Sequence, residues 1–272
     1  MGASRTILVI VAHADDAAGF CGGAIATWAD RGDRVVLVRG GNDENDSIGL
    51  GRAETKEVNA RELRAAAAIL GIEEVIDLDY PDGTLGDIPG AVLRARLITI
   101  FRRVRPYVVV TFDPYGVLYE NNQDHLAIGK AVDEAFWAAA CDKYNPEEFA
   151  EGLELHGAVE RWYFARRLFE ATEAVDIGPV FERKVDALLA HEAMMRDTML
   201  HFQLQGQTAG MRVPMLDDSD GHALRRFVGY VTRKDAQETG KRHAIELAEE
   251  FRVVRFGGLY GSLEDLFVSD SE

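Results

Sequence analysis

Short apolar runs alternate with longer amphipathic stretches through the first half of the chain. The apolar runs lie at residues 7–12, 34–39, 75–78 and 107–112. Runs of this length with few polar interruptions are typical of parallel strands that are buried on both faces. Apolar residues at helical spacing follow them, at residues 24–29, 52–70, 92–101 and 124–140. This alternation predicts an α/β fold with a Rossmann-like, mainly parallel sheet and helices on both faces.

The pattern becomes less regular after residue 145. We expect a strand at 161–169, a long helix at 179–205, a loop at 207–221, a helix at 235–250 and a strand at 251–256. No linker or repeat separates this part from the first half. The sequence therefore predicts a single α/β domain over residues 1–258. Its core is expected at 1–145 and a completing part at 146–258, before an acidic tail at 259–272.

Charge and hydropathy argue against a nucleic-acid-binding protein and against a membrane protein. The 272 residues carry a formal net charge of −16, and they contain no basic cluster with interleaved aromatic residues of the kind that nucleic-acid binding requires. No apolar stretch approaches the roughly 18 residues that span a bilayer, and the start of the chain does not resemble a secretory signal. We therefore expect a cytoplasmic protein that binds neither nucleic acid nor membranes.

Three polar side chains follow the first apolar run directly. His13, Asp15 and Asp16 occupy the turn at the carboxyl end of this strand, where open α/β sheets bind ligands. Either aspartate could instead cap the helix that follows. Adjacent carboxylates at the end of a buried strand repel each other unless a cation is present, however, and this favours a metal site.

A second polar group, Asn122 to His125, lies beyond the fourth apolar run. In a parallel sheet the two loops lie at the same edge, so one imidazole from each loop and one carboxylate can form a His₂Asp set. Three protein ligands with an open fourth position are typical of a catalytic rather than a structural zinc site. A carboxylate that is not needed as a ligand could accept the proton of the metal-bound water. Asp124 could alternatively cap the helix that starts near His125.

The two loops also resemble the signatures of a known family. The segment AHADDA at 12–17 is similar to its AHPDDE motif, and NQDH at 122–125 is similar to its HPDH motif. On this basis the chain resembles the LmbE/PIG-L family of zinc-dependent N-acetylglucosaminyl deacetylases. Weaker agreement comes from Gly22-Gly23, from residues 82–85 and from Ala190-His191.

The resemblance implies roles for residues of both loops. It assigns one zinc ion per chain to His13, Asp16 and His125. Asp15 would act as general base on the zinc-bound water, and Asp124 would orient the site. The implied reaction is hydrolysis of an acetamide on an amino sugar or another small polar substrate. The family also implies a Rossmann-like fold and homo-oligomers, either trimers or hexamers.

Asn122 is the most informative departure from the family pattern. The family has a histidine at this position, which is thought to stabilise the oxyanion of the transition state. Asparagine still donates a neutral hydrogen bond, but it carries no charge and transfers no proton. Losing one oxyanion donor outright lowers a rate on the order of 10²- to 10³-fold, so we expect the exchange to cost less than that.

Two further interpretations of the function stay open in the sequence. A hydratase of the same superfamily could use zinc and Asp15 to add water to a double bond, with Arg39 and Arg52 holding a carboxylated substrate. A non-catalytic metal-binding descendant is the second alternative, although it would not need to keep Asp15. Asn42 and Asp43, in a glycine-led loop after the second strand, and Arg52 are candidates for substrate contacts.

His191 and Glu192 resemble the start of a helical zinc motif. The second histidine that this motif needs four residues after the first is absent, because Met195 occupies that position. We therefore expect His191 to face solvent or to cap a helix.

Overall fold

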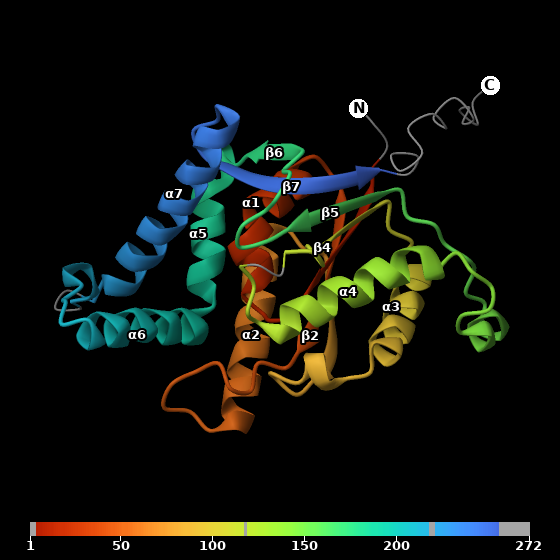
Figure 1. The fold of residues 1–272 in the computed structure, drawn as a ribbon, viewed down its shortest axis with the longest axis horizontal. Coiled ribbons are helices and arrows are strands. Elements are labelled where there is room, and N and C mark those ends of the chain that lie inside the picture. The colour runs from red at the N-terminus through yellow and green to blue at the C-terminus, as the bar shows by residue number, and fades with distance from the viewer. Residues whose placement is uncertain (1–3, 117–118, 218–220, 256–272) are drawn as a thin grey trace.

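A seven-stranded sheet runs through the molecule in the order β3-β2-β1-β4-β5-β7-β6 (Figure 1). The computed structural model describes residues 4–116, 119–217 and 221–255. The strands are β1 (Thr6–Val11), β2 (Arg34–Gly41), β3 (Glu74–Tyr80), β4 (Val108–Phe112), β5 (Glu160–Phe164), β6 (Glu173–Asp176) and β7 (Ala248–Arg255). Strands β1 to β5 are parallel, whereas β7 is antiparallel to both β5 and β6. The predicted mainly parallel sheet is therefore confirmed.

Helices cover both faces of this sheet, as the sequence predicts. They are α1 (Asp16–Asp30), α2 (Arg52–Leu70), α3 (Gly90–Val104), α4 (Gln123–Ala138), α5 (Phe181–Ala190), α6 (Glu192–Thr208) and α7 (Ala223–His243). Short 3₁₀ turns lie at Leu85–Asp87, Pro146–Glu151, Gly178–Val180 and Pro214–Leu216. Helices α3 and α4 pack together on one face, while α1, α2 and α5 pack together on the other (Figure 1).

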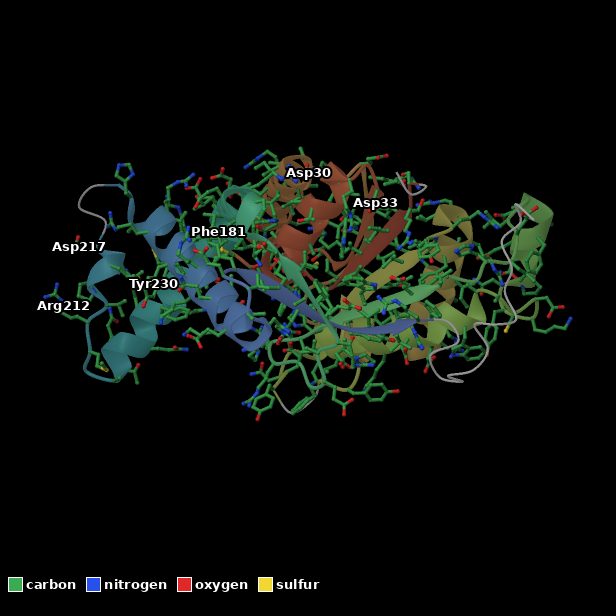
Figure 2. All side chains as sticks on the ribbon, turned by 90° about the horizontal axis from the view of Figure 1, so that it is seen from above. Asp30, Asp33, Phe181, Arg212, Asp217 and Tyr230 are labelled. Atoms are coloured by element: carbon green, nitrogen blue, oxygen red, sulfur yellow. The ribbon has the colours of Figure 1, made fainter. Side chains whose placement is uncertain are left out.

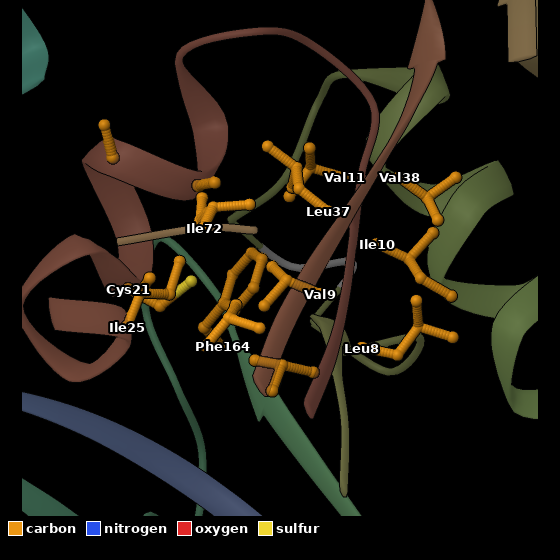
Figure 3. Close-up of a cluster of buried hydrophobic side chains, with 14 of the residues drawn as sticks. Leu8, Val9, Ile10, Val11, Cys21, Ile25, Leu37, Val38, Ile72 and Phe164 are labelled. Atoms are coloured by element: carbon orange, nitrogen blue, oxygen red, sulfur yellow. The ribbon is translucent and has the colours of Figure 1, made fainter. Parts of the chain in front are cut away.

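Strand β1 is buried on both faces, which explains its uninterrupted apolar sequence. Its side chains point alternately to the two faces of the sheet, because successive residues of a strand do so. Figure 3 shows Val9 on the side of Cys21 and Phe164, and Leu8 and Ile10 on the opposite side. All five of these side chains are at most 2% exposed. The strand that carries the first polar loop is thus fixed by packing from both sides.

The carboxyl ends of β1 and β4 meet at the point where the strand order reverses. From β1 the chain builds outward on one side through β2 and β3, and on the other side through β4 and β5. Loops that leave such a switch point diverge to opposite faces and leave a crevice between them, where ligands bind in open α/β sheets. The topology therefore brings the two predicted polar loops together.

The second half of the chain differs from the sequence expectation in three places. The long helix expected at 179–205 is two helices, α5 and α6, because His191 between them has a non-helical backbone (φ −84°, ψ 56°). The helix expected at 235–250 lies earlier, at 223–243, and ends where Ala244 adopts a left-handed conformation (φ 56°). The strand expected at 161–169 already ends at Phe164, and β6 was not expected.

Helices α6 and α7 extend away from the sheet as a lobe. Figure 2 shows Arg212, Asp217 and Tyr230 in this lobe, at the end of the molecule farthest from the parallel strands. No helix in the described ranges is long and apolar enough to cross a membrane. The acidic tail predicted at 259–272 lies outside the described residues, and the single-domain boundary at residue 258 stays a prediction.

Candidate metal centre and its cavity

The two predicted polar loops meet at one point above the ends of β1 and β4. The Nδ1 atom of His13 lies 3.1 Å from the Nε2 atom of His125. One carboxylate oxygen of Asp16 lies 3.3 Å from the same Nε2 atom, and the other lies 3.5 Å from the Nδ1 atom of His13. All three side chains are buried, with exposed fractions of 7%, 2% and 5% for His13, His125 and Asp16. These residues form a candidate metal triad.

The separations within this triad fit a tetrahedral metal ion. Zinc binds histidine nitrogen and carboxylate oxygen at about 2.0–2.2 Å, so two ligand atoms at a tetrahedral angle lie about 3.3 Å apart. The two nitrogen atoms are 3.1 Å apart, and each lies 3.3 or 3.5 Å from a different oxygen of Asp16, so these separations are close to that value. Two imidazoles and one carboxylate are also ligand types that zinc accepts, and three of them leave a fourth position open.

The backbone of the first loop fixes Asp16. Its carboxylate accepts a hydrogen bond of 2.7 Å from the backbone N–H of His13, so the ligand is held by the turn that also carries the first histidine. Burial opposes ionisation of Asp16, but the charges and hydrogen bonds of His125 and His13 lower its pKa well below the ordinary range. Asp16 is therefore a carboxylate in the folded protein, as a metal ligand must be.

Asp15 occupies the N-cap position of α1 without using its side chain as a cap. Its carboxylate lines the cavity instead. Burial, together with the neighbouring charge of Asp16, raises the pKa of Asp15 to about 7. A carboxyl group with a pKa near neutrality is suited to accept and return a proton. The capping interpretation of Asp15 is thus not realised.

Asp124 supports the first histidine from the opposite side. Its Oδ2 atom lies 3.6 Å from the Nε2 atom of His13. The same carboxylate accepts hydrogen bonds of 2.9 Å from the backbone N–H groups of Gly83 and Leu85, which fix its orientation. Asp124 therefore does not cap α4, and the orienting role that the family resemblance implies for it stays a prediction.

The cap of α4 is Asn122. Its side-chain oxygen accepts a hydrogen bond of 2.9 Å from the backbone N–H of Asp124. Asn122 also lines the cavity, and with its oxygen engaged in the cap, its amide nitrogen keeps its hydrogen-bond donors. Asn122 thus combines a structural role with a hydrogen-bond donor near the metal triad.

A cavity of about 780 Å³ opens from the triad. On one side lies what we call the strand-end wall, formed by residues of the loops and first helical turns that follow the strands, including His13, Asp15, Asp46, Asp82, Asn122 and His125. On the other side lies what we call the helix wall, formed by residues of α5, α6 and α7 that include Leu188, Met194, Met195, Phe202, Phe227, Val228 and Val231. The first wall is mainly polar, whereas the second is mixed, because the same helices also contribute Lys184, Asp197, Thr198, His201, Thr232 and Asp235.

Carboxylates dominate the ionisable groups around this cavity. They are Asp15, Asp16, Asp46, Asp82, Asp197, Asp235, Glu249 and Glu250. Within the described residues, the lysine and arginine side chains that line it are Arg166 and Lys184. The ammonium of Lys184 is paired with Glu249 at 2.6 Å. The cavity therefore has a strongly negative character.

The three predicted substrate contacts lie outside the lining of this cavity. Asn42 and Asp43 are 4% and 0% exposed, and Asp43 binds the guanidinium of Arg39 at 2.7 Å. Arg39 is itself buried and also binds Asp77, so it is not available to a substrate. Arg52 is exposed at the start of α2 and does not line the cavity.

Three carboxylates that the sequence did not single out lie at the site. Asp46 and Asp82 line the cavity, and Glu120 lies 2.8 Å from the Nδ1 atom of His125. Asp46 belongs to the loop that was expected to contact substrate, although the residues chosen there were others. For Glu120 the sequence offers only a weak indication, namely that this carboxylate lies five residues before the predicted ligand His125.

His191 is buried rather than exposed, which contradicts the expectation that it faces solvent. Its side chain is 1% exposed, and neither ring nitrogen has a hydrogen-bond partner in the described structure. The alternative expectation was that His191 caps a helix. It does occupy the N-cap position of α6, but its side chain forms no capping hydrogen bond. Burial lowers the pKa of His191 to about 4.

Comparison with known proteins yields one matching family and several relatives. Residues 8–136 match the profile of the family described as PIG-L: GlcNAc-PI de-N-acetylase. A diacetylchitobiose deacetylase of Thermococcus kodakarensis is 30% identical over 197 residues, which is 70% of this chain and 70% of that protein. A 4-oxalmesaconate hydratase of Pseudomonas putida is 30% identical over 196 residues, or 68% of this chain and 72% of that protein.

A solved structure supports the fold over nearly the whole chain. The N,N′-diacetylchitobiose deacetylase from Pyrococcus horikoshii superposes with a TM-score of 0.75 at 21% identity, covering 97% of this chain and 89% of the other. At this level of identity the likeness concerns the fold. It extends the similarity beyond residue 136 to the strands and helices of the second half.

Proposed function

The chain belongs to the PIG-L family of de-N-acetylases, and from this premise we propose that it is a zinc-dependent deacetylase of a sugar-like or other small polar substrate. The bond that breaks is the amide between an acetyl group and the substrate nitrogen. The observation that carries the proposal is the pairing of a metal triad with Asp15, a carboxylate that lies beside the triad without being needed as a ligand.

The triad of His13, Asp16 and His125 would hold the zinc ion, since its separations fit a tetrahedral site. A bound zinc ion would lower the pKa of water and polarise the carbonyl of the acetamide.

Asp15 would act as general base and then as general acid. Its carboxylate takes a proton from the attacking water and returns it to the nitrogen of the departing amine, so the same group completes the cycle unchanged. The raised pKa of Asp15, about 7, matches this exchange at neutral pH. Its place on the cavity lining puts it within the space that a substrate would occupy.

Asn122 would stabilise the oxygen of the acetamide as negative charge develops on it. Its side-chain oxygen is engaged in capping α4, which leaves the amide N–H group as the donor. Asp124, through the Nε2 atom of His13, would orient the first histidine. These roles agree with those that the family resemblance implies for the matching positions.

The hydratase relative makes water addition to a carboxylated substrate the second candidate. The charges around the cavity favour the deacetylase. Arg39 and Arg52, which were expected to hold a substrate carboxylate, do not line the cavity. Two other cations among the described residues do, but Lys184 is paired with Glu249 at 2.6 Å and Arg166 lies 3.4 Å from Glu120. An anionic substrate would also meet repulsion from the surrounding aspartates and glutamates, whereas a neutral acetamido sugar would not.

Acetate release tests the proposal directly. The zinc-loaded protein is incubated with N-acetylglucosamine and with diacetylchitobiose, and free acetate and primary amine are measured. We expect acetate and amine in equal amounts, loss of both after chelation, and recovery on addition of zinc. No acetate from either sugar, together with loss of the ultraviolet absorbance of an unsaturated dicarboxylic acid, would favour the hydratase instead.

A cytoplasmic location and assembly into trimers or hexamers remain proposals taken from the sequence. Size-exclusion chromatography with light scattering of the purified chain tests the assembly, and a monomer would contradict it.

A further inference from the structure

We propose that Glu120 is a positioning residue that holds the ring of His125 with the lone pair of its Nε2 atom toward the metal. The proposal goes beyond the roles that the sequence assigned, because Glu120 belongs to neither motif. It rests on the proposed function in one respect, namely that His125 binds a metal ion.

The contact between Glu120 and His125 decides which ring nitrogen carries the proton. The Oε2 atom of Glu120 lies 2.8 Å from the Nδ1 atom of His125, and the two residues are 8% and 2% exposed. A carboxylate only accepts hydrogen bonds when ionised, so the Nδ1 atom must donate. In neutral imidazole the other nitrogen, Nε2, then has a lone pair, and this is the atom that faces His13 and Asp16.

Glu120 is itself held in place. Its Oε1 atom accepts a hydrogen bond of 2.9 Å from the backbone N–H of Asn122. The guanidinium of Arg166 approaches the same carboxylate at 3.4 Å from the outer side. A backbone donor and a guanidinium thus face this carboxylate, an environment that favours its ionised form.

The plane of the His125 ring is fixed separately. The ring stacks on Phe112 with 4.0 Å between centroids and an interplanar angle of 16°. Stacking fixes the plane but leaves two orientations that differ by a half-turn of the ring. The carboxylate of Glu120 selects the orientation that presents Nε2 to the triad.

Both ligand histidines are therefore backed by a carboxylate on the ring nitrogen that faces away from the metal. For His13 the nearest such groups are Asp82 and Asp124, at 3.5 and 3.6 Å. For His125 it is Glu120, at the shorter distance of 2.8 Å. Such carboxylate–histidine–metal arrangements raise the basicity of the ligand, and losing the carboxylate typically lowers metal affinity 10- to 100-fold.

The test compares zinc affinities of two variants by competition with a chromophoric chelator. Glu120→Gln keeps the shape of the side chain but removes its charge, and we expect zinc affinity to fall about 10- to 100-fold. The matched control is Glu148→Gln, which makes the same exchange at another buried carboxylate, paired with Arg102 at 2.9 Å and remote from the triad. We expect the control to bind zinc as the wild type does. Wild-type affinity in Glu120→Gln would overturn the proposal.

A second measurement needs no metal and no activity. ¹⁵N NMR of the metal-free wild type at alkaline pH should show the proton of His125 on Nδ1, and Glu120→Leu should shift it toward Nε2. A proton on Nε2 in the wild type would overturn the proposal. If His125→Ala bound zinc as tightly as the wild type, the proposed function would fail instead, while the NMR result would still report on Glu120, so the two failures are distinguishable.

Discussion

The two walls of the cavity differ in how their side chains are held. On the strand-end wall, the side chains of Asp16, His125 and Asn122 are each fixed by hydrogen bonds to neighbours. On the helix wall the apolar side chains are held by packing instead: five of the seven named above are at most 8% exposed, while Phe202 and Val231 are 44% and 39% exposed. The strand-end loops leave a sheet that is packed on both sides, whereas α6 and α7 extend beyond it (Figure 1). We infer that the first wall performs the chemistry and that the second only shapes the space.

Asp15→Asn should have the largest effect, because it removes the proposed base from the strand-end wall. We expect kcat to fall by about 10²- to 10⁴-fold, the usual contribution of general acid–base catalysis. Zinc content should stay at the wild-type level, since Asp15 is not a proposed ligand. Steady-state acetate release and metal analysis on the same samples check both points. Asp30→Asn, at the far end of α1, serves as the control and should change neither.

Two substitutions at Asn122 separate its cap from its proposed donor. Asn122→Asp keeps an oxygen that can cap α4 but removes the amide N–H, so we expect kcat to fall on the order of 10²- to 10³-fold with little change in stability. Asn122→Ala removes both groups, so it should additionally lower the free energy of unfolding by about 1 kcal/mol. Urea denaturation and acetate release measure the two effects. A wild-type rate in Asn122→Asp would remove the amide from the catalytic account.

His191, buried between α5 and α6, should make this part of the molecule sensitive to acid. In the unfolded chain its pKa is about 6.5, whereas burial lowers it to about 4 in the folded protein. Below about pH 6.5 the unfolded state therefore binds a proton that the folded state does not. The free energy of unfolding consequently decreases as the pH is lowered. At pH 5 the loss should be on the order of 2 kcal/mol relative to pH 7.

His191→Leu should lose less stability than the wild type between pH 7 and pH 5, because leucine does not titrate. Urea denaturation at both values measures the difference. Equal losses in the two proteins would show that His191 is not the group responsible.

Phe202→Ser should have the smallest effect, since it alters only the shape of the helix wall. We expect KM to change by less than about tenfold with kcat preserved, as for a group that contacts substrate equally in the ground and transition states. Phe169→Ser is the matched control, because Phe169 is also 44% exposed but does not line the cavity. A large loss of kcat in Phe202→Ser would contradict the inference that the helix wall takes no part in the chemistry.

The fold was predictable wherever local pattern and burial agree. The expected strand at 34–39 and helix at 52–70 correspond to β2 and α2 because their apolar positions are the ones that pack. The break at His191 could not be read from an apolar pattern that runs through it without interruption. The start of α7 at Ala223 was also missed, although Phe227 and Val228 in its first turns are buried.

The site was predictable as far as the two motifs reach. His13 and Asp16 lie close together in the sequence, and the adjacency of β1 and β4 brings His125 to them. Contacts outside the motifs were harder to predict: Glu120 lies five residues before His125 without belonging to a motif, and Asp82 comes from the loop after β3. Arg39 was expected at the substrate because its two acidic partners, the buried Asp43 and the partly exposed Asp77, could not be inferred from the sequence.

The central claim is that the strand-end wall holds one catalytic metal ion in the His₂Asp triad. Metal analysis of the purified wild type and of His125→Ala, alongside acetate release by each, tests it most directly. The account predicts about one zinc per chain in the wild type, and loss of both zinc and activity in His125→Ala. A wild-type protein that releases acetate after complete removal of its metal, or a His125→Ala variant that keeps both zinc and activity, would contradict it.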